Sequence, residues 1–143
     1  MSAQIFTTRG RRRLLDVIKD GGGAFYLELF RLLQAPANAN LVTGSIVDAA
    51  FSGYVSNFTS DIAIFWDVAR IEGTSAVLEG AEVVFQHDGG PIAETVRGCY
   101  IVEAGLGREL EVISFEVFDA PQQMAGANDV MRITPRLMLN ICE

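Results

Sequence analysis

The sequence has few of the side chains from which most catalytic and metal sites are built. Among its 143 residues there are one histidine, His87, and two cysteines, Cys99 and Cys142. A Ser-His-Asp arrangement would depend on His87, and no G-x-S-x-G motif accompanies it. Cys99 and Cys142 lie 43 residues apart and make no metal-binding spacing with each other, so a metal site built on His and Cys lacks ligands. We therefore expect a protein that is not an enzyme and that carries no cofactor.

Long apolar runs are also missing. Every apolar stretch is short and interrupted by charge, whereas a membrane-spanning helix needs about 20 apolar residues. Residues 1–13 show no apolar stretch ahead of their arginines, so we expect neither a secretory signal nor a membrane partner. In cytosolically assembled proteins buried cysteines usually stay free, and a bridge between Cys99 and Cys142 would require the chain to return to the Cys99 strand.

Basic residues are scarce and unevenly placed. The chain carries 11 Lys and Arg against 18 Asp and Glu, a net charge of −7. This balance argues against nucleic-acid binding by the domain as a whole. Residues 1–20 hold five basic and two acidic residues, a net of +3, which leaves −10 on the remainder. Half of all residues are apolar, and that excess favours a subunit interface and hence a homo-oligomer.

Four arginines form a basic cluster near the start of the sequence: Arg9, Arg11, Arg12 and Arg13. One interpretation is a solvated first turn of a helix. A second is an arm that docks on an acidic neighbour, such as an adjacent subunit. Nucleic acid is a third and weaker interpretation, because no aromatic residue and only one glycine, Gly10, lies among the arginines. We take these four arginines as candidate partner-docking residues.

The segment 9–19 has the pattern of a short amphipathic helix. Thr8 is a suitable N-cap, and Leu14, Leu15 and Ile18 share one face. Three consecutive glycines at 21–23 end it. The sequence thus predicts a basic arm with a short helix over 1–23 and a β domain over 24–143.

From Ala24 onward the apolar residues recur with a period of two, which is typical of strands. Ala120-Pro121 is expected to end a strand, and Pro135 predicts an edge or a bulge because proline cannot donate to a ladder. Residues 46–51 fit either a strand or a helical turn. The predicted strands cover 24–33, 61–70, 81–87, 94–104, 108–118 and 129–139.

Six or seven strands separated by turns predict a mainly β fold. Short strands with regular turns favour an antiparallel β-sandwich, jelly-roll-like or a flattened barrel, preceded by the short N-terminal helix. The alternation of each strand indicates which side chains face inward. The expected core residues are Phe25, Leu27, Trp66, Tyr100, Phe115, Ile133 and Leu137.

Two turns carry residues that invite a functional interpretation. His87 precedes Asp88-Gly89-Gly90 and is expected to be a turn residue. Asp88, or Asn128 with Asp129, could supply oxygen ligands to calcium. Neither turn has the spaced acidic series of a dedicated calcium loop, so we expect no metal there.

Several short segments, taken in order, resemble a known group of proteins. They lie at 52–54 (SGY), 98–104 (GCYIVEA), 107–110 (GREL), 114–116 (SFE) with Pro121, and 129–139 (DVMRITPRLML). In order and spacing this set resembles small β-rich virion proteins of tailed bacteriophages, over about residues 24–140. Cys99 stands where that group more usually has an aromatic or small residue.

The resemblance implies a non-enzymatic component of the phage particle, such as a capsid decoration, a fibre or a tail-associated protein. It also implies other virion proteins as partners, a trimer as the oligomeric state, and a place in the virion after assembly in the host cytoplasm. The alternative is a carbohydrate- or receptor-binding β-sandwich used in host adhesion. Such a module should expose aromatic residues in its loops, where only Tyr54 and Phe58 are obvious.

Overall fold

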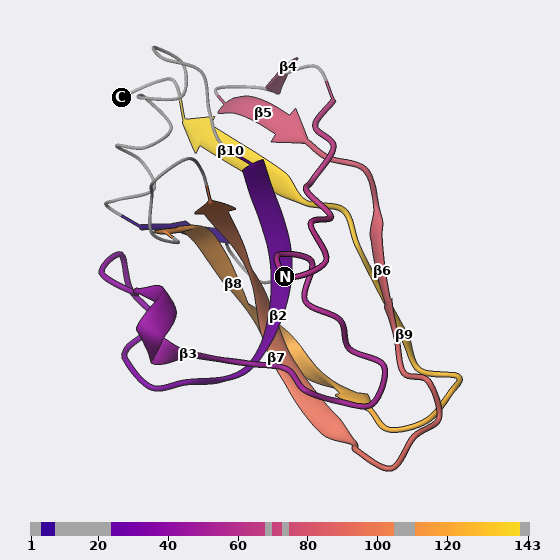
Figure 1. Cartoon of the computed structure of the whole chain (residues 1–143). Helices are drawn as coiled ribbons and strands as arrows, with labels where there is room; N and C mark the ends of the chain where they lie inside the picture. The colour runs from indigo at the N-terminus through magenta and orange to yellow at the C-terminus, as the bar shows by residue number, and fades with distance from the viewer. Residues whose placement is uncertain (1–3, 8–23, 68–69, 73–74, 105–110, 141–143) are drawn as a thin grey trace.

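The fold is mainly β with antiparallel sheets. The computed structural model describes residues 4–7, 24–67, 70–72, 75–104 and 111–140 (Figure 1). These residues form ten strands and one short 3-10 turn, η1. Their bounds are β1 Gln4–Phe6, β2 Ala24–Leu33, η1 Thr43–Ser45, β3 Ile46–Asp48, β4 Arg70–Glu72, β5 Ser75–Glu79, β6 Val83–Gln86, β7 Glu94–Ala104, β8 Glu111–Met124, β9 Val130–Ile133 and β10 Arg136–Asn140.

The main sheet contains five strands in the order β1-β8-β7-β2-β3, all antiparallel. β2 and β7 confirm the strands predicted over 24–33 and 94–104. Residues 46–48 adopt the strand alternative, as β3. β1 places residues 4–6 at the far edge of this sheet, beside β8. The helix predicted over 9–19 lies outside the described residues.

The prediction that Ala120-Pro121 ends a strand is wrong, because β8 continues through both residues to Met124. The pairing with β7 explains how. Val96 pairs with Gln122 and Gly98 pairs with Val117, so residues 118–121 lie opposite Arg97 alone. Within such a bulge the missing N–H of proline costs no ladder hydrogen bond.

A second layer contains the smaller sheets β6-β9 and β10-β5-β4. β6 and β9 run side by side in Figure 1 and lead into β5 and β10. The single strand predicted over 129–139 is divided into β9 and β10 on either side of Thr134 and Pro135. Pro135 lies at this break, and β10 after it is an edge strand of its sheet, which agrees with the predicted edge. The Pro135 carbonyl accepts a hydrogen bond from the Gly80 N–H at 2.8 Å.

The strand predicted over 61–70 is wrong for residues 61–67 and right at Arg70, where β4 begins. Residues 61–67 form only an isolated bridge between Trp66 and Gly80. The segment crosses from the main sheet to the second layer. The Ile64 N–H binds the carbonyl of Phe25 in β2, whereas the Asp67 N–H binds that of Glu79 in β5. Its alternating side chains therefore reflect a crossing between layers and not a ladder.

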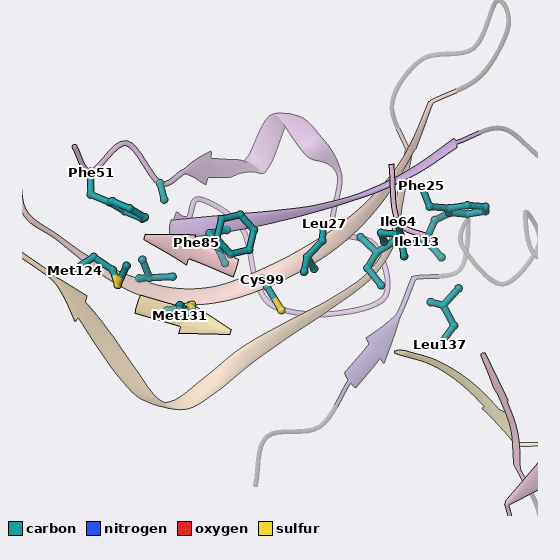
Figure 2. Close-up of a cluster of buried hydrophobic side chains, with 14 residues drawn as sticks. Phe25, Leu27, Phe51, Ile64, Phe85, Cys99, Ile113, Met124, Met131 and Leu137 are labelled. Atoms are coloured by element: carbon teal, nitrogen blue, oxygen red, sulfur yellow. The ribbon is translucent and has the colours of Figure 1, made fainter. Parts of the chain in front are cut away.

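Buried side chains form two clusters, one on each face of the main sheet. The first lies between the main sheet and the second layer, where Leu27, Phe85 and Met131 meet (Figure 2). The second lies on the opposite face and includes Tyr100 and Phe115. Phe25, Leu27, Tyr100, Phe115 and Leu137 are buried as predicted, whereas Trp66 and Ile133 are partly buried against the first cluster. The predicted core is thus shared between two faces.

Candidate functional site

The three most exposed large apolar side chains among the described residues lie on one irregular segment, residues 55–65, together with Phe58. Val55 and Ile62 are each 57% exposed, Phe58 is 39% exposed, and Phe65 is 78% exposed. Single exposed apolar residues are common on protein surfaces, and four large ones within eleven residues make this segment a candidate interaction site. We call residues 55–65 the apolar segment.

All of the apolar segment except Phe65 belongs to a longer stretch, residues 49–64, that runs along β2 where β3 has ended. β3 pairs with the C-terminal half of β2 only. Beyond it, Ala49 N–H donates to the Leu29 carbonyl and Ile64 N–H donates to the Phe25 carbonyl, at 3.0 and 2.7 Å. Buried backbone polar groups need partners, and this irregular stretch supplies them.

Two side chains act in place of backbone groups along this edge. The Tyr54 hydroxyl accepts a hydrogen bond from the Leu29 N–H at 3.1 Å. The Asn57 side-chain amide donates to the Leu27 carbonyl at 2.8 Å. Because side chains make these contacts, the backbone of residues 54–57 does not need an extended conformation to satisfy β2.

Glu28 of β2 fixes the start of the apolar segment. Its carboxylate is buried, at 2% exposure, and accepts hydrogen bonds from four neutral donors. Two of these donors are the hydroxyls of Tyr54 and Ser56, at 2.7 and 2.8 Å. The other two are the backbone N–H groups of Asn57 and Phe58, at 3.3 and 2.8 Å. A buried carboxylate requires such donors to offset its desolvation, so loop and carboxylate stabilise each other.

The same carboxylate affects Tyr54. Burial and the nearby Glu28 charge raise the pKa of Tyr54 well above its ordinary value. The phenol therefore stays protonated at neutral pH and keeps its role as donor to Glu28.

Tyr26 holds the middle of the apolar segment from the same strand. Its ring packs edge-on against Phe58, with ring centroids 5.4 Å apart. Its hydroxyl donates to the Asp61 carboxylate at 3.0 Å. Asp61 has a φ of 55°, in the left-handed region that aspartate tolerates better than most residues. Thus Tyr26 and Glu28, two residues apart on one face of β2, hold both sides of the turn at 58–61.

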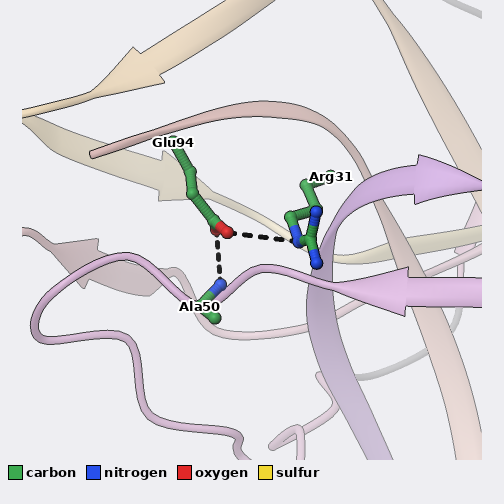
Figure 3. A network of polar contacts seen from close by, with 3 residues as sticks. All are labelled: Arg31, Ala50 and Glu94. Atoms are coloured by element: carbon green, nitrogen blue, oxygen red, sulfur yellow. Dashed lines mark hydrogen bonds and ion pairs between the residues drawn. The ribbon is translucent and has the colours of Figure 1, made fainter. Parts of the chain in front are cut away.

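An ion pair secures the entry to this stretch (Figure 3). Glu94 at the start of β7 accepts a hydrogen bond from the backbone N–H of Ala50. Its other carboxylate oxygen lies 3.2 Å from Nε of Arg31 in β2. The Glu94 side chain of β7 thereby binds both Arg31 of β2 and the backbone of Ala50.

The predicted docking residues Arg9, Arg11, Arg12 and Arg13 lie outside the described residues, so the structure does not place them beside any surface. Cys142 also lies outside them. Cys99 is free and buried. Burial, together with the charge of Glu116, raises the pKa of its thiol to about 12.

His87 follows β6 in an irregular connection, and its side chain has a structural role there. His87 is fully buried and stacks on Phe51. Its Nε2 lies 2.8 Å from the Ile92 carbonyl, and its Nδ1 accepts a hydrogen bond from the Gly89 N–H. The second contact requires an unprotonated Nδ1, so Nε2 carries the proton and donates to Ile92.

The carboxylates considered for calcium are occupied by their own turns. Asp88 accepts a hydrogen bond from the Gly90 N–H, at 2.8 Å. Asp129 accepts from Ala125 and Gly126, and these two backbone bonds lower its pKa. Across the described ranges, no group of three or more His, Cys, Asp or Glu residues is placed to hold a metal ion. The same part of the chain contains no helix long and apolar enough to cross a membrane.

Sequence reasoning found part of this site. It singled out Tyr54 and Phe58 as loop aromatics, but Tyr54 is occupied by Glu28 and only Phe58 is exposed. It assigned Ile62 and Phe65 to a strand. The missed signal was Glu28 itself, an acidic residue between Tyr26 and Phe30 on an otherwise apolar strand face.

Comparison with protein-family models, with curated proteins and with solved structures gives no match for this chain.

Proposed function

We propose that this protein is a non-enzymatic structural component of a tailed-bacteriophage virion that acts by docking and oligomerisation. In this proposal it is a capsid decoration, fibre or tail component, assembled in the host cytoplasm. Its partners are other virion proteins and further copies of itself, most simply in a trimer, and it binds neither nucleic acid nor membrane. The observation that carries the proposal is the exposed apolar segment fixed on β2.

The proposed fold is a β-sandwich, jelly-roll-like or a flattened barrel. The first cluster supports it, because its members come from β2, β7 and β8 on one side and from β6, β9 and β10 on the other. Such a rigid domain suits an assembly protein, since its surface is preorganised and little conformational entropy is lost on docking.

The energetics favour docking through the apolar segment. Burying a Val, Ile or Phe side chain that was exposed contributes about 1.5–3 kcal/mol. Phe65 and Ile62, at 78% and 57% exposure, retain much of that free energy for a partner. Glu28 and Tyr26 already hold the backbone in place, so the cost of ordering the loop has been met within the domain.

Mass spectrometry of purified phage particles tests this proposal. We expect the protein at a fixed copy number relative to the major capsid or tail protein. Sedimentation of the purified protein should show a species larger than the 15.5 kDa chain at micromolar concentration. Absence from particles, with a stable monomer in solution, would contradict the proposal.

A receptor- or carbohydrate-binding module is the second candidate, and the exposure of Phe65 favours it. Aromatic rings exposed in loops are common contacts in binding surfaces. Binding of the isolated protein to host cells or to a glycan array, lost on Phe65→Ala, would support this candidate. Particle incorporation that is unaffected by Phe65→Ala would favour it over docking through the apolar segment.

A further inference from the structure

The apolar segment belongs to a long stretch of the chain that has only negative charge. Residues 32–69 contain three aspartates, Asp48, Asp61 and Asp67, and no Lys, Arg or His. Asp61 and Asp67 lie within or beside the apolar segment, and both are exposed. A partner for this surface should therefore combine apolar side chains with positive charge.

One segment of this chain has that chemistry. Residues 9–19 (RGRRRLLDVIK) contain five basic residues and one acidic residue, a net of +4, together with Leu14, Leu15 and Ile18. Elsewhere the basic residues are dispersed and outnumbered by acidic ones. Charge and apolar content thus match residues 9–19 to the apolar segment.

The described residues on either side of 9–19 are Thr7 and Ala24, and both lie at the end of the main sheet where the apolar segment contacts β2. The Thr7 N–H binds the Ile113 carbonyl, near the start of β8. The chain resumes at Ala24, which pairs with Ala104 at the end of β7. At this same end of β2, Phe25 and Tyr26 contact Ile64 and Asp61 of the apolar segment. Because the chain enters the domain beside this surface, residues 9–19 of the same copy are a competing occupant, which the experiment below distinguishes from those of a second copy.

We propose that the apolar segment of one copy binds residues 9–19 of a second copy of this chain. The proposal rests on the oligomeric docking assigned above as the protein's function. Repeated head to tail, with each copy giving its residues 9–19 to the next, the contact generates a ring when the rotation between copies closes, and a trimer is the smallest such ring beyond a dimer. The apolar contacts supply most of the free energy, and the arginines supply electrostatic complementarity with Asp61 and Asp67.

Cross-linking between two differently tagged variants tests the proposal on the full chain. One variant carries Leu15→Cys and the other Phe65→Cys. Both carry Cys142→Ser and keep the buried Cys99. After mixing and mild oxidation, we expect a disulfide-linked product of twice the 15.5 kDa chain mass that contains both tags. The matched control replaces Phe65→Cys with Val117→Cys, a 40% exposed position in β8 outside the apolar segment.

Each remaining outcome decides against the proposal. Failure of the product carrying both tags to form, or its formation to the same extent with Val117→Cys, overturns it. A double variant Leu15→Cys/Phe65→Cys that forms only intrachain links at every concentration also overturns it, because residues 9–19 then bind their own copy. The readout uses purified protein, so it is independent of whether the protein is found in particles. Changing Arg9, Arg11, Arg12 and Arg13 to Ser should reduce the product, and raised salt should do the same.

Discussion

The ring of Phe30 occupies the space that a side chain at position 98 would need. The two residues are direct cross-strand partners in β2 and β7. A Cβ built on Gly98 would overlap Cζ of Phe30 and the carbonyl oxygen of Glu116. The Phe30 ring thus packs over Gly98 beside the β7–β8 bulge and belongs to the second cluster.

We expect Gly98→Ala to destabilise the protein by at least about 1–3 kcal/mol, the usual cost of overpacking a core. The backbone oxygen of Glu116 cannot move aside as a flexible side chain could. Urea denaturation measures the effect. Gly126→Ala is the control, because an added Cβ there meets nothing within 4 Å. Equal stabilities of the two variants would contradict the packing described.

Glu28→Gln should lower the free energy of unfolding by about 2–3 kcal/mol, since the four donors around position 28 lose a charged acceptor. Limited proteolysis should then cleave within residues 54–58. The matched control is Glu82→Gln, which removes an exposed ion pair with Arg132 and should cost little. A variant as stable and protease-resistant as the control would show that the carboxylate does not hold the loop.

Phe65 and its neighbour Trp66 should respond differently to truncation to alanine. Trp66 packs edge-on against Phe25 at 6.0 Å, so Trp66→Ala should cost about 3 kcal/mol of stability. Phe65→Ala should change stability by less than about 0.5 kcal/mol but weaken self-association measured by sedimentation. If Phe65→Ala lost stability and left self-association unchanged, Phe65 would be a packing residue and not an exposed contact residue.

Native Cys99 should be almost inert to thiol reagents at pH 8. Its pKa is raised to about 12, so the reactive thiolate is scarce and the sulfur is also buried. In a Cys142→Ser background, reaction should begin only when denaturant unfolds the chain. An exposed cysteine introduced by Val117→Cys should react at once in the native state. Fast modification of Cys99 in native protein would contradict its burial.

The lowered pKa of Asp129 predicts an acid-dependent contribution to stability. Because the folded state favours the carboxylate, the contribution is present above the ordinary pKa of 3.8 and is lost as the pH falls through the folded-state pKa. Denaturation across this range should show a weaker pH dependence for Asp129→Asn than for the parent protein. Identical pH profiles would mean that the bonds to Ala125 and Gly126 do not depend on charge.

The sequence predicted the elements whose side-chain pattern and hydrogen bonding agree. β2 and β7 lie inside the main sheet and are buried on both faces, so their strand-like apolar stretches correspond to real ladders. Residues 61–67 also have a strand-like pattern, but their backbone bonds go to two different layers. Periodicity reports which side chains are buried and not where the N–H groups bind, so it could not distinguish these cases.

The same limit applies to β8 and to the candidate site. Pro121 was expected to end the strand because proline cannot donate to a ladder. The strand continues through a bulge of several residues, and such a bulge leaves no local pattern in the sequence. The role of Glu28 depends on donors 26 to 30 residues further along the chain. Only the unusual position of an acidic residue in an apolar row indicated it.

The side-chain contacts of Tyr54 and Asn57 along β2 also determine how copies of this protein can meet. An uncovered sheet edge offers free N–H and carbonyl groups to any extended chain, and that is the route to β-augmentation and fibrous aggregation. Here the Leu29 N–H and the Leu27 carbonyl are already bound by a phenol and an amide. An incoming strand would have to displace both, so this edge does not template further strands.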